Sequence, residues 1–253
     1  MADKVVAIVQ SNYIPWKGYF DLINAVDEFI LYDVVQYTRR DWRNRNLIKT
    51  RDGLRWLTIP VQVKGRYVQT IDETRISDPA WPRHHLEAIR HSYRRAPFFD
   101  HYEPVLREMY RDDSDLLSDV NERFLRAVCE FLGITTVISR ASAYTRVPGR
   151  NEQLVALCRE SGASRYLSGP SARGYLDEAL FEGAGVRVEW MDYADYPEYP
   201  QLFPPFEHGV SVIDLILNVG PAAPQYMKSF GTSAAARSPS VLPPTTPSPR
   251  SAD

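Results

Sequence analysis

The sequence predicts an α/β fold with a mainly parallel, Rossmann-like sheet, flanking helices, a helical middle section and a disordered C-terminal tail. Short apolar runs alternate with helix-like stretches, as expected when buried parallel strands are joined by helices. From Thr232 onward Pro, Ser, Thr and Ala dominate, and such a segment cannot bury enough apolar surface to fold. We therefore predict one domain over residues 1–228 and a disordered tail over residues 229–253.

The first half of the chain supplies the start of this alternation. Residues 5–9 (VVAIV) are typical of a buried strand, and residues 18–26 have helical spacing. Residues 29–32 (FILY) and 56–63 (WLTIPVQV) predict two further strands, the latter at an edge or bulge because Pro60 has no N–H. Residues 81–95 and 98–110 are predicted helices, separated by the helix breaker Pro97.

The second half continues the pattern. In residues 114–132, apolar side chains recur at helical steps, and Gly133 follows as the C-terminal cap. Strands are predicted at residues 135–138, 166–168 and 186–191, and helices at residues 152–161, 175–183 and 211–219. We interpret the helix-rich region 80–132 as an inserted or appended helical layer.

The bulk composition limits the function classes. Of 253 residues, 44% are hydrophobic and 25% charged, which is ordinary for a globular protein with a sizeable core. The net charge of -2 argues against a protein that coats nucleic acid. We find no signal peptide and no apolar run approaching the ~18 residues of a membrane span. Cys129 and Cys158 lie in helix-like apolar patterns, which fits a reducing compartment, so we expect a cytoplasmic protein.

The loop after the first strand, residues 10–20 (QSNYIPWKGYF), is the strongest candidate binding segment. In open α/β sheets, ligands bind beyond the carboxyl ends of the strands. Pro15 and Gly18 shape the backbone, and the N–H groups at the next helix start favour an anion. A turn that only packs on the core is the alternative. The predicted substrate-binding residues are Gln10, Asn12, Tyr13, Trp16, Gly18 and Tyr19.

The loop after the second strand, residues 32–46 (YDVVQYTRRDWRNRN), should lie at the same edge of the sheet. Four arginines fall within seven residues, and arginine forks bind carboxylate or phosphate. Asp33, at the strand end, is a candidate catalytic base or a group that orients an amine. A solvated charged turn is the alternative. The predicted substrate-binding residues are Gln36, Arg40, Trp42, Arg43, Asn44 and Arg45.

A third strand–helix loop, residues 168–175 (SGPSARGY), combines glycines with Ser171 and Arg173, a set able to hold phosphate or carboxylate. It is not a P-loop, because the Gly-Lys-Ser/Thr ending is missing. Binding and plain packing are equally supported here. The candidate binding residues are Ser168, Gly169, Ser171 and Tyr175.

The segment before the last predicted helix contains Gln201, a candidate ligand of the substrate, and His208. His208, Ser211 and Asp214 invite comparison with a catalytic triad. Ser211 and Asp214, however, are three residues apart before an apolar run, which is the pattern of a helix capping box. We interpret that pair as a cap and keep His208 as a candidate general base.

The histidines and cysteines give little support to a metal site or to a cysteine nucleophile. His84, His85 and His91 lack an i, i+4 pair, and the sequence has no Cys/His cluster, so we predict no metal and no other cofactor. Cys129 lies on the apolar side of its predicted helix, which argues against a cysteine nucleophile.

Several segments together resemble the WbqC-like proteins. They are QSNYIPWKGYF, DVVQYTRRDWRNRNLIK, WLTIPV, YLSGPSARGYLD and YPQL followed by SVIDLILNVG, in order from about residue 5 to residue 220. Family members occur in bacterial gene clusters for O-antigen, other surface glycans and secondary metabolites. The resemblance implies transfer of glycine or another aminoacyl group to an amino sugar. This chain has Gln10-Ser11 where family members often have Gln-Pro, which predicts a less rigid turn.

A strand, a Pro/Gly turn, a helix and a second strand also resemble the start of HIGH-motif nucleotidyltransferases. Those enzymes use two histidines in the turn to stabilise a triphosphate. Here Tyr19 stands at the second of these positions and no histidine is near, which puts that mechanism in doubt but not nucleotide binding.

The leading hypothesis is an enzyme that transfers an acyl or aminoacyl group to an amine. Arg40, Arg43 and Arg45 would hold phosphates, and Asp33 or His208 would accept the amine proton. The expected partners are an anionic or phosphorylated small molecule and an acyl-carrier protein, without nucleic acid or membrane. A nucleotide-binding or nucleotidyl-transferring enzyme is the second hypothesis, and a non-catalytic partner protein of the pathway is the third.

Overall fold

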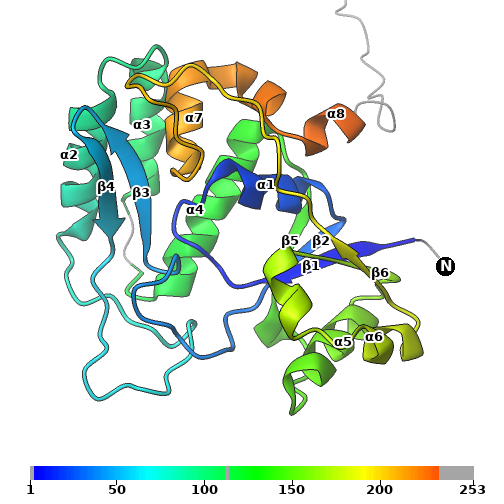
Figure 1. Cartoon of the computed structure of the whole chain (residues 1–253). Helices are drawn as coiled ribbons and strands as arrows, with labels where there is room; N and C mark the ends of the chain where they lie inside the picture. The colour runs from blue at the N-terminus through cyan, green and yellow to red at the C-terminus, as the bar shows by residue number, and fades with distance from the viewer. Residues whose placement is uncertain (1–2, 112–113, 234–253) are drawn as a thin grey trace, which may run out of the picture.

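The computed structural model describes residues 3–111 and 114–233 (Figure 1). Its centre is a five-stranded sheet in the order β5-β2-β1-β6-β7, in which all neighbouring strands are parallel. This confirms the predicted mainly parallel sheet. The strands are β1 (Val5–Val9), β2 (Glu28–Leu31), β5 (Val137–Arg140), β6 (Arg165–Ser168) and β7 (Arg187–Trp190).

Helices cover both faces of this sheet, because its strands alternate buried side chains to either side. Val5 and Ala7 of β1 belong to a large core with α1 (Lys17–Asn24) and α4 (Leu117–Leu132). Val6 and Ile8 belong to a second core with α5 (Arg150–Glu160) and α6 (Glu178–Gly183). Figure 1 shows these two helix pairs on opposite sides of the sheet, as a Rossmann-like fold requires.

The strand order creates a switch point at the centre of the sheet. From β1 the chain continues to β2 on one side, whereas β6 pairs with β1 on the other side. The loops that follow β1 and β6 therefore diverge at the same sheet edge, which is where open α/β sheets bind ligands.

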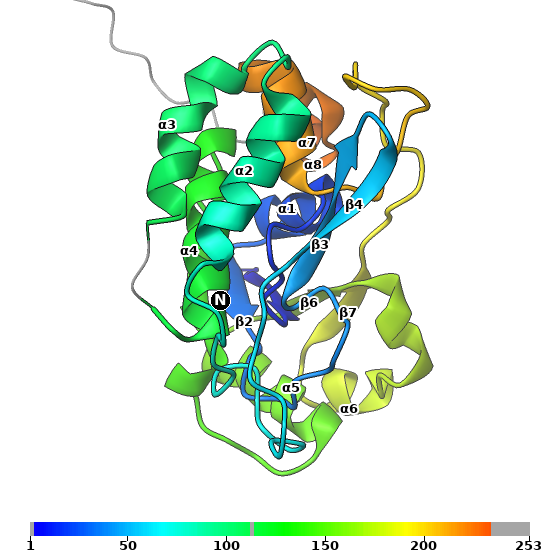
Figure 2. The ribbon, with the colours of Figure 1, turned by 90° about the vertical axis from the view of Figure 1, so that its left-hand side faces the viewer.

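The helix-rich middle section forms a layer beside the sheet (Figure 2). It contains α2 (Trp81–Tyr93), α3 (Phe99–Met109) and α4, which confirms the predicted helices in region 80–132. Gly133 ends α4 in the left-handed conformation with φ of 72°, as predicted from its position. Helix α7 (Val212–Val219) packs against α3 and the hairpin described next.

The predicted strand at residues 56–63 is wrong in its extent. The structure has an antiparallel hairpin outside the main sheet, β3 (Arg45–Thr50) and β4 (Gly53–Thr58). Strand β4 ends before Pro60, which has no N–H to donate. Strand β3 was not predicted, because polar and charged side chains hide its alternation: Asn46 and Ile48 are buried on one face.

The C-terminal part of the described chain returns from the sheet to the helical layer. Residues 191–211 run without regular helix or strand from β7 to α7 (Figure 1). The predicted start of the tail at residue 229 is wrong, because Ser229–Ser233 forms α8. The Ser229 amide and hydroxyl donate to the buried Asp21 carboxylate at 2.9 and 2.5 Å, which fixes this segment. The rest of the predicted tail, residues 234–253, lies outside the described residues.

Three short 3-10 helices complete the elements of the described chain: η1 (Ala141–Ala143), η2 (Pro170–Gly174) and η3 (Gly220–Tyr226). Within residues 3–111 and 114–233, every helix is too short or too polar to cross a membrane.

Candidate functional site

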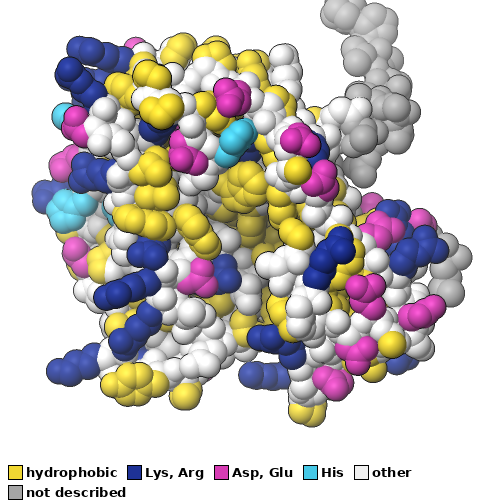
Figure 3. Space-filling model, viewed as in Figure 1, with side chains coloured by type: hydrophobic (Ala, Val, Ile, Leu, Met, Phe, Trp, Pro, Cys, Tyr) yellow, Lys and Arg dark blue, Asp and Glu magenta, His cyan; other side chains and the backbone are white. Residues whose placement is uncertain are grey.

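A cavity of about 330 Å³ lies where the loop after β1 meets the β3–β4 hairpin and the 191–211 segment. Figure 3 shows the face hollowed between the hairpin and the sheet, with hydrophobic side chains inside the hollow. We call this the central cavity. It is lined by Asn12, Pro15, Trp16, Trp42, Asn46, His208 and Gly209. Its size and mixture of aromatic and amide groups suit a small-molecule ligand.

The two predicted loops contact each other directly at this cavity. The backbone N–H of Tyr13 donates to the Trp42 carbonyl oxygen at 3.0 Å. The Arg43 guanidinium donates to Gln10 Oε1 at 3.0 Å and also to Asn12 Oδ1. Arg43 is therefore largely engaged within the protein, and it fixes the orientation of the Asn12 amide.

The turn at Ile14 is strained and is held by Asn46. Ile14 has a φ of 35°, which is a rare conformation for a β-branched residue. The Asn46 side-chain amide donates to the carbonyl oxygens of Tyr13 and Ile14 at 3.0 and 2.9 Å. Strained backbone of this kind clusters at functional sites, where surrounding contacts maintain it.

Trp16 forms an aromatic wall of the central cavity. Its ring meets Tyr193 and Tyr196 edge to face, each at 5.4 Å between centroids. A Cβ at Gly18 would overlap the Trp16 indole, so glycine at this position allows the ring to lie over the start of α1.

His208 differs from the buried His85 in its hydrogen bonds. Both ring nitrogens of His85 have partners, Nδ1 with the Tyr13 hydroxyl at 2.8 Å and Nε2 with the Thr58 carbonyl at 3.1 Å. Nδ1 of His208 is buried without a hydrogen-bond partner in the described chain, and its ring lines the central cavity. His85 is thus a structural residue, whereas His208 contributes to the cavity wall and its Nδ1 has no such partner among the described residues.

A buried polar network supports the segment that carries His208. Gln201 donates to Asp214 Oδ1 at 2.9 Å and to the Glu207 carbonyl at 2.9 Å, and it accepts from Lys49 Nζ at 2.6 Å. Asp214 also accepts from the Tyr199 hydroxyl. Burial raises the pKa of the Asp214 carboxyl. Gln201 therefore positions the 201–208 loop rather than lining the central cavity.

Of the capping box predicted at the start of α7, only the bond accepted by Ser211 is present. Ser211 Oγ accepts from the Ile213 N–H at 3.3 Å, as an N-cap residue does. The Asp214 carboxylate instead turns to the network described above, where its contacts with Tyr93 and Tyr199 replace the expected bond to the Ser211 N–H.

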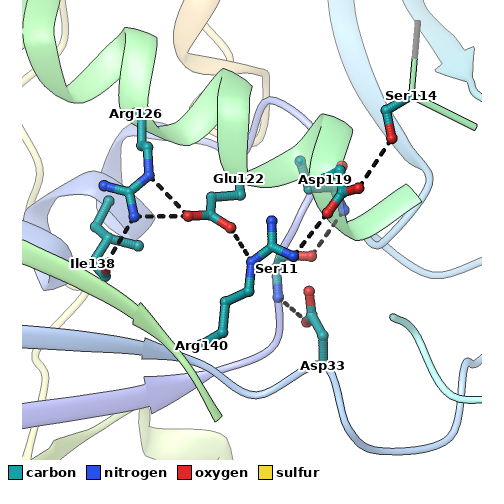
Figure 4. Close-up of polar contacts among 9 residues, drawn as sticks. Ser11, Asp33, Ser114, Asp119, Glu122, Arg126, Ile138 and Arg140 are labelled. Carbon is teal, nitrogen blue, oxygen red and sulfur yellow. Dashed lines mark hydrogen bonds and ion pairs between the residues drawn. The ribbon is translucent and has the colours of Figure 1, made fainter. Parts of the chain in front are cut away.

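Asp33 lies in a separate, smaller cavity of about 110 Å³. Its Oδ1 accepts from the Ser11 N–H at 2.7 Å, and its side chain faces the cluster of Asp119, Glu122 and Arg140 (Figure 4). Burial raises the pKa of Asp33 to about 6, although the bonds from Ser11 oppose this shift. The structure therefore does not bring the two candidate bases, Asp33 and His208, to one cavity.

The other residues of the second loop that were predicted to bind substrate make different contacts. Arg45 stacks on Trp56 at 4.1 Å and donates to the Arg40 carbonyl, while the Arg40 side chain is exposed. Asn44 is buried and donates to the Ile59 carbonyl at 2.8 Å, which ties β3 to the chain after β4. Gln36 donates to the Tyr67 carbonyl and lines another cavity. Of this loop, Trp42 alone among the predicted residues lines the central cavity.

Tyr13 and Tyr19, the two tyrosines of the first loop that were predicted to bind substrate, pack beneath the site. Tyr19 donates from its hydroxyl to the Gln10 carbonyl at 2.9 Å, and burial raises its pKa. Tyr13 is fully buried and bonds His85 and Tyr110 in the helical layer.

The third predicted loop lies at the same sheet edge but does not line the central cavity. Gly169 approaches Tyr193, which in turn contacts Trp16. Ser168 is buried and donates to the Tyr166 hydroxyl, whereas Ser171 is exposed. The Tyr175 ring is covered by Arg150 at 4.4 Å.

Pro15, Asn46 and Gly209 line the central cavity but are not among the binding residues predicted from the sequence. Asn46 lay inside the quoted second loop, and its burial could have been inferred had β3 been recognised as a strand. Gly209 joins the site only through the irregular segment, which leaves no periodic signal.

Both cysteines are buried and free, in agreement with their apolar patterns. Burial raises the pKa of each thiol to about 12. In the described part of the chain, no group of three or more His, Cys, Asp or Glu side chains is placed to hold a metal ion.

The sequence profile of the WbqC-like protein family matches residues 10–226, which include every residue of the central cavity. An uncharacterized protein of Mycobacterium tuberculosis, Rv1507c, is 50% identical over 226 residues, covering 89% of this chain and 98% of that protein. No solved structure matches the chain. The profile spans nearly the whole described fold, including both loops that build the site, and the chain belongs to the WbqC-like protein family.

Proposed function

We propose that this protein transfers an acyl or aminoacyl group, such as glycyl, to an amine of an amino sugar or related metabolite in surface-glycan or secondary-metabolite biosynthesis. His208 carries this proposal. It is the one titratable side chain among the described residues lining the central cavity, and its Nδ1 lacks a partner. A transfer to an amine needs such a group, because the nitrogen loses a proton as it is acylated.

In the proposed step, the amine nitrogen attacks the carbonyl carbon of an activated acyl donor. A C–N bond forms, and the bond from the carbonyl carbon to the leaving sulfur or oxygen breaks. The imidazole of His208 takes the proton from the amine and returns it to the leaving group. A thioester on an acyl-carrier protein is one donor of this chemical type.

Asn12 is suited to stabilise the charge that develops on the carbonyl oxygen. Arg43 donates to Asn12 Oδ1, and the Asn12 side-chain N–H₂ has no partner among the described residues. The amide is thus oriented as a hydrogen-bond donor before any ligand binds. Preorganised donors of this kind contribute strongly to catalysis of acyl transfer.

Asp33 acquires a positioning role in this proposal. The Asp33 carboxylate accepts a hydrogen bond from the N–H of Ser11, the residue before Asn12. Asp33 also lines the smaller cavity. It would act as the base only on a substrate that enters that smaller cavity. Trp16 and Trp42 offer apolar faces for a sugar ring or an acyl chain.

The test is acylation of amines by the purified protein. The protein is incubated with glycyl- and acetyl-pantetheine thioesters and a panel of amino sugars, and mass spectrometry detects the acylated amine. His208→Gln is expected to lower kcat by about 100-fold or more with little change in KM. His84→Gln, an exposed histidine on α2, is the matched control and should retain full turnover. Full turnover in His208→Gln would remove His208 from the mechanism, and no acylation of any amine by the wild type would count against the activity.

The position of the site also supports the second hypothesis, a nucleotide-binding enzyme. The central cavity adjoins the loop that follows β1 at the switch point, and Trp16 or Trp42 could stack on a base. Tyr19, in contrast, is buried and its hydroxyl donates to the Gln10 carbonyl, so it does not replace the second histidine of the HIGH motif. Pyrophosphate release from a nucleoside triphosphate, measured in the same incubations, distinguishes the two reactions.

A further inference from the structure

A second, strongly basic cavity lies between the β3–β4 turn and the end of α2. Its volume is about 430 Å³, and its lining includes Arg51, Arg55, Arg94 and Arg95, with one carboxylate, Asp52. We call it the basic pocket. Figure 3 shows Lys and Arg side chains gathered along this margin of the molecule, beside the hairpin and α2. Because the whole chain has a net charge of -2, this positive charge is a local feature.

The four arginines differ from the others near the site because their guanidinium groups are unused. Among the described residues, none of the four makes a side-chain hydrogen bond, an ion pair or a ring contact. Arg43 and Arg45, by comparison, are bound to side chains, a carbonyl and a tryptophan ring. Like charges in one pocket repel, and an anion bound between them would relieve this repulsion.

The end of a helix explains only part of this cluster. Arg94 and Arg95 follow the last turn of α2, where cations interact favourably with the helix dipole. Arg51 and Arg55 come from the hairpin, yet they line the same pocket. Two unrelated elements thus converge on one basic surface.

An apolar strip joins the basic pocket to the central cavity. Leu54 lines the basic pocket and lies two residues before Trp56, so both side chains are on one face of β4. They are 48% and 42% exposed, which is high for large apolar side chains. The Trp56 ring lies 5.4 Å from that of Trp42, which lines the central cavity. From Gly53 to Trp56 strand β4 spans roughly 10 Å, so the strip suits an extended ligand.

We propose that the basic pocket binds the phosphate or diphosphate group of a substrate whose other end reaches the central cavity along Leu54 and Trp56. Arginine forks bind phosphate oxygens in pairs, and four of them provide for two phosphate groups. The anion site depends only on the residues of the basic pocket, whereas the placement of the reacting end rests on the proposed acyl transfer.

Isothermal titration calorimetry with inorganic pyrophosphate tests the anion site without any reaction. We expect saturable binding at about 150 mM salt, where weak surface attraction is screened. The double variants Arg94→Ala/Arg95→Ala and Arg51→Ala/Arg55→Ala should each weaken binding by about tenfold or more. The matched control is Arg83→Ala/Arg107→Ala, which removes two exposed arginines that pair with glutamates on α2 and α3. It should leave the affinity unchanged.

Three outcomes would overturn the site: no saturable binding by the wild type, equal affinity in all three double variants, or loss in the control alone. Because each basic-pocket pair comes from a different element, a variant that fails to fold leaves the other as the test.

UDP and farnesyl diphosphate then separate the two sources of a diphosphate. Tighter binding of UDP than of pyrophosphate points to a nucleotide, and tighter binding of farnesyl diphosphate points to a lipid carrier. Trp56→Ala should remove that gain but not pyrophosphate binding, and an unchanged gain would contradict the apolar strip. Pyrophosphate binding without acylation of any amine would refute the proposed transfer while supporting the anion site.

Discussion

Asn46 holds Ile14 in a left-handed backbone conformation at the wall of the central cavity. Its side-chain amide donates to the carbonyl oxygens of both Tyr13 and Ile14, while its Oδ1 accepts from the Leu47 N–H at 2.8 Å. The site thus depends on one amide that links the hairpin to the loop after β1.

The first prediction concerns this amide. Asn46→Asp keeps the acceptor for Leu47 but loses both donated bonds and buries a charge. We expect a loss of about 3 kcal/mol or more in the free energy of unfolding, measured by urea denaturation. The control is Asn151→Asp, since the Asn151 amide donates to the Tyr175 carbonyl at the surface, and it should cost under about 0.5 kcal/mol. Equal losses in the two variants would mean that the strained turn does not need Asn46.

The second prediction concerns Gly18 and Trp16. A methyl group at Gly18 would overlap the Trp16 indole, so Gly18→Ala should displace this ring from the cavity wall. We expect a destabilisation of about 1–3 kcal/mol, as for other overpacked sites, and a shifted Trp16 indole N–H resonance in NMR spectra. Gly183→Ala, at a helical position with no atom near the new Cβ, should be neutral or gain up to about 1 kcal/mol. An unmoved Trp16 resonance in Gly18→Ala would contradict this packing.

The loop positions could be predicted from the sequence because strand patterns and sheet geometry are local. The apolar run of β1 and the FILY run of β2 place their following loops at one sheet edge, and Tyr13 and Trp42 do meet there. What the arginines do at that edge could not be predicted, because it depends on contacts across the fold: Arg43 is engaged by Gln10 and Asn12.

The separation of Asp33 from His208 could not be predicted from the sequence either. Asp33 is turned to the smaller cavity by a bond to the Ser11 N–H, a backbone contact that no side-chain pattern records. His208 reaches the central cavity through an irregular segment whose path is set by Lys49, Gln201 and Asp214. Such long-range polar contacts leave no periodic pattern in the sequence, so the sequence does not predict them.

The third prediction tests that path. The Lys49 ammonium donates to Gln201 and to the Pro205 carbonyl, and burial lowers its pKa. Lys49→Met keeps the apolar stem but loses these bonds, so amide hydrogen exchange should become faster across residues 199–209, by about tenfold if roughly 1.4 kcal/mol is lost locally. Lys4→Met removes comparable bonds to Glu28 and Ser161 near the start of β1. It should leave exchange in residues 199–209 unchanged; faster exchange in both variants would show global rather than local destabilisation.

The fourth prediction concerns the pH dependence of stability set by Asp33. Burial raises its pKa in the folded chain from 3.8 to about 6, so the folded state binds this proton more tightly than the unfolded state. The contribution of Asp33 to stability is therefore most favourable below about pH 4 and is lost as the pH rises through 6. A shift of about two pKa units corresponds to roughly 3 kcal/mol.

Asp33→Asn stays neutral, and its amide oxygen can still accept from the Ser11 N–H. Its free energy of unfolding relative to the wild type should thus rise by about 2–3 kcal/mol between pH 4 and pH 7, measured by urea denaturation. Asp100→Asn, exposed on α3, provides the reference for pH effects unrelated to burial. If the Asp33→Asn difference were constant with pH, the Asp33 carboxylate would have to be ionised at no cost, and the smaller cavity would have to supply it with a cation or water that offsets burial.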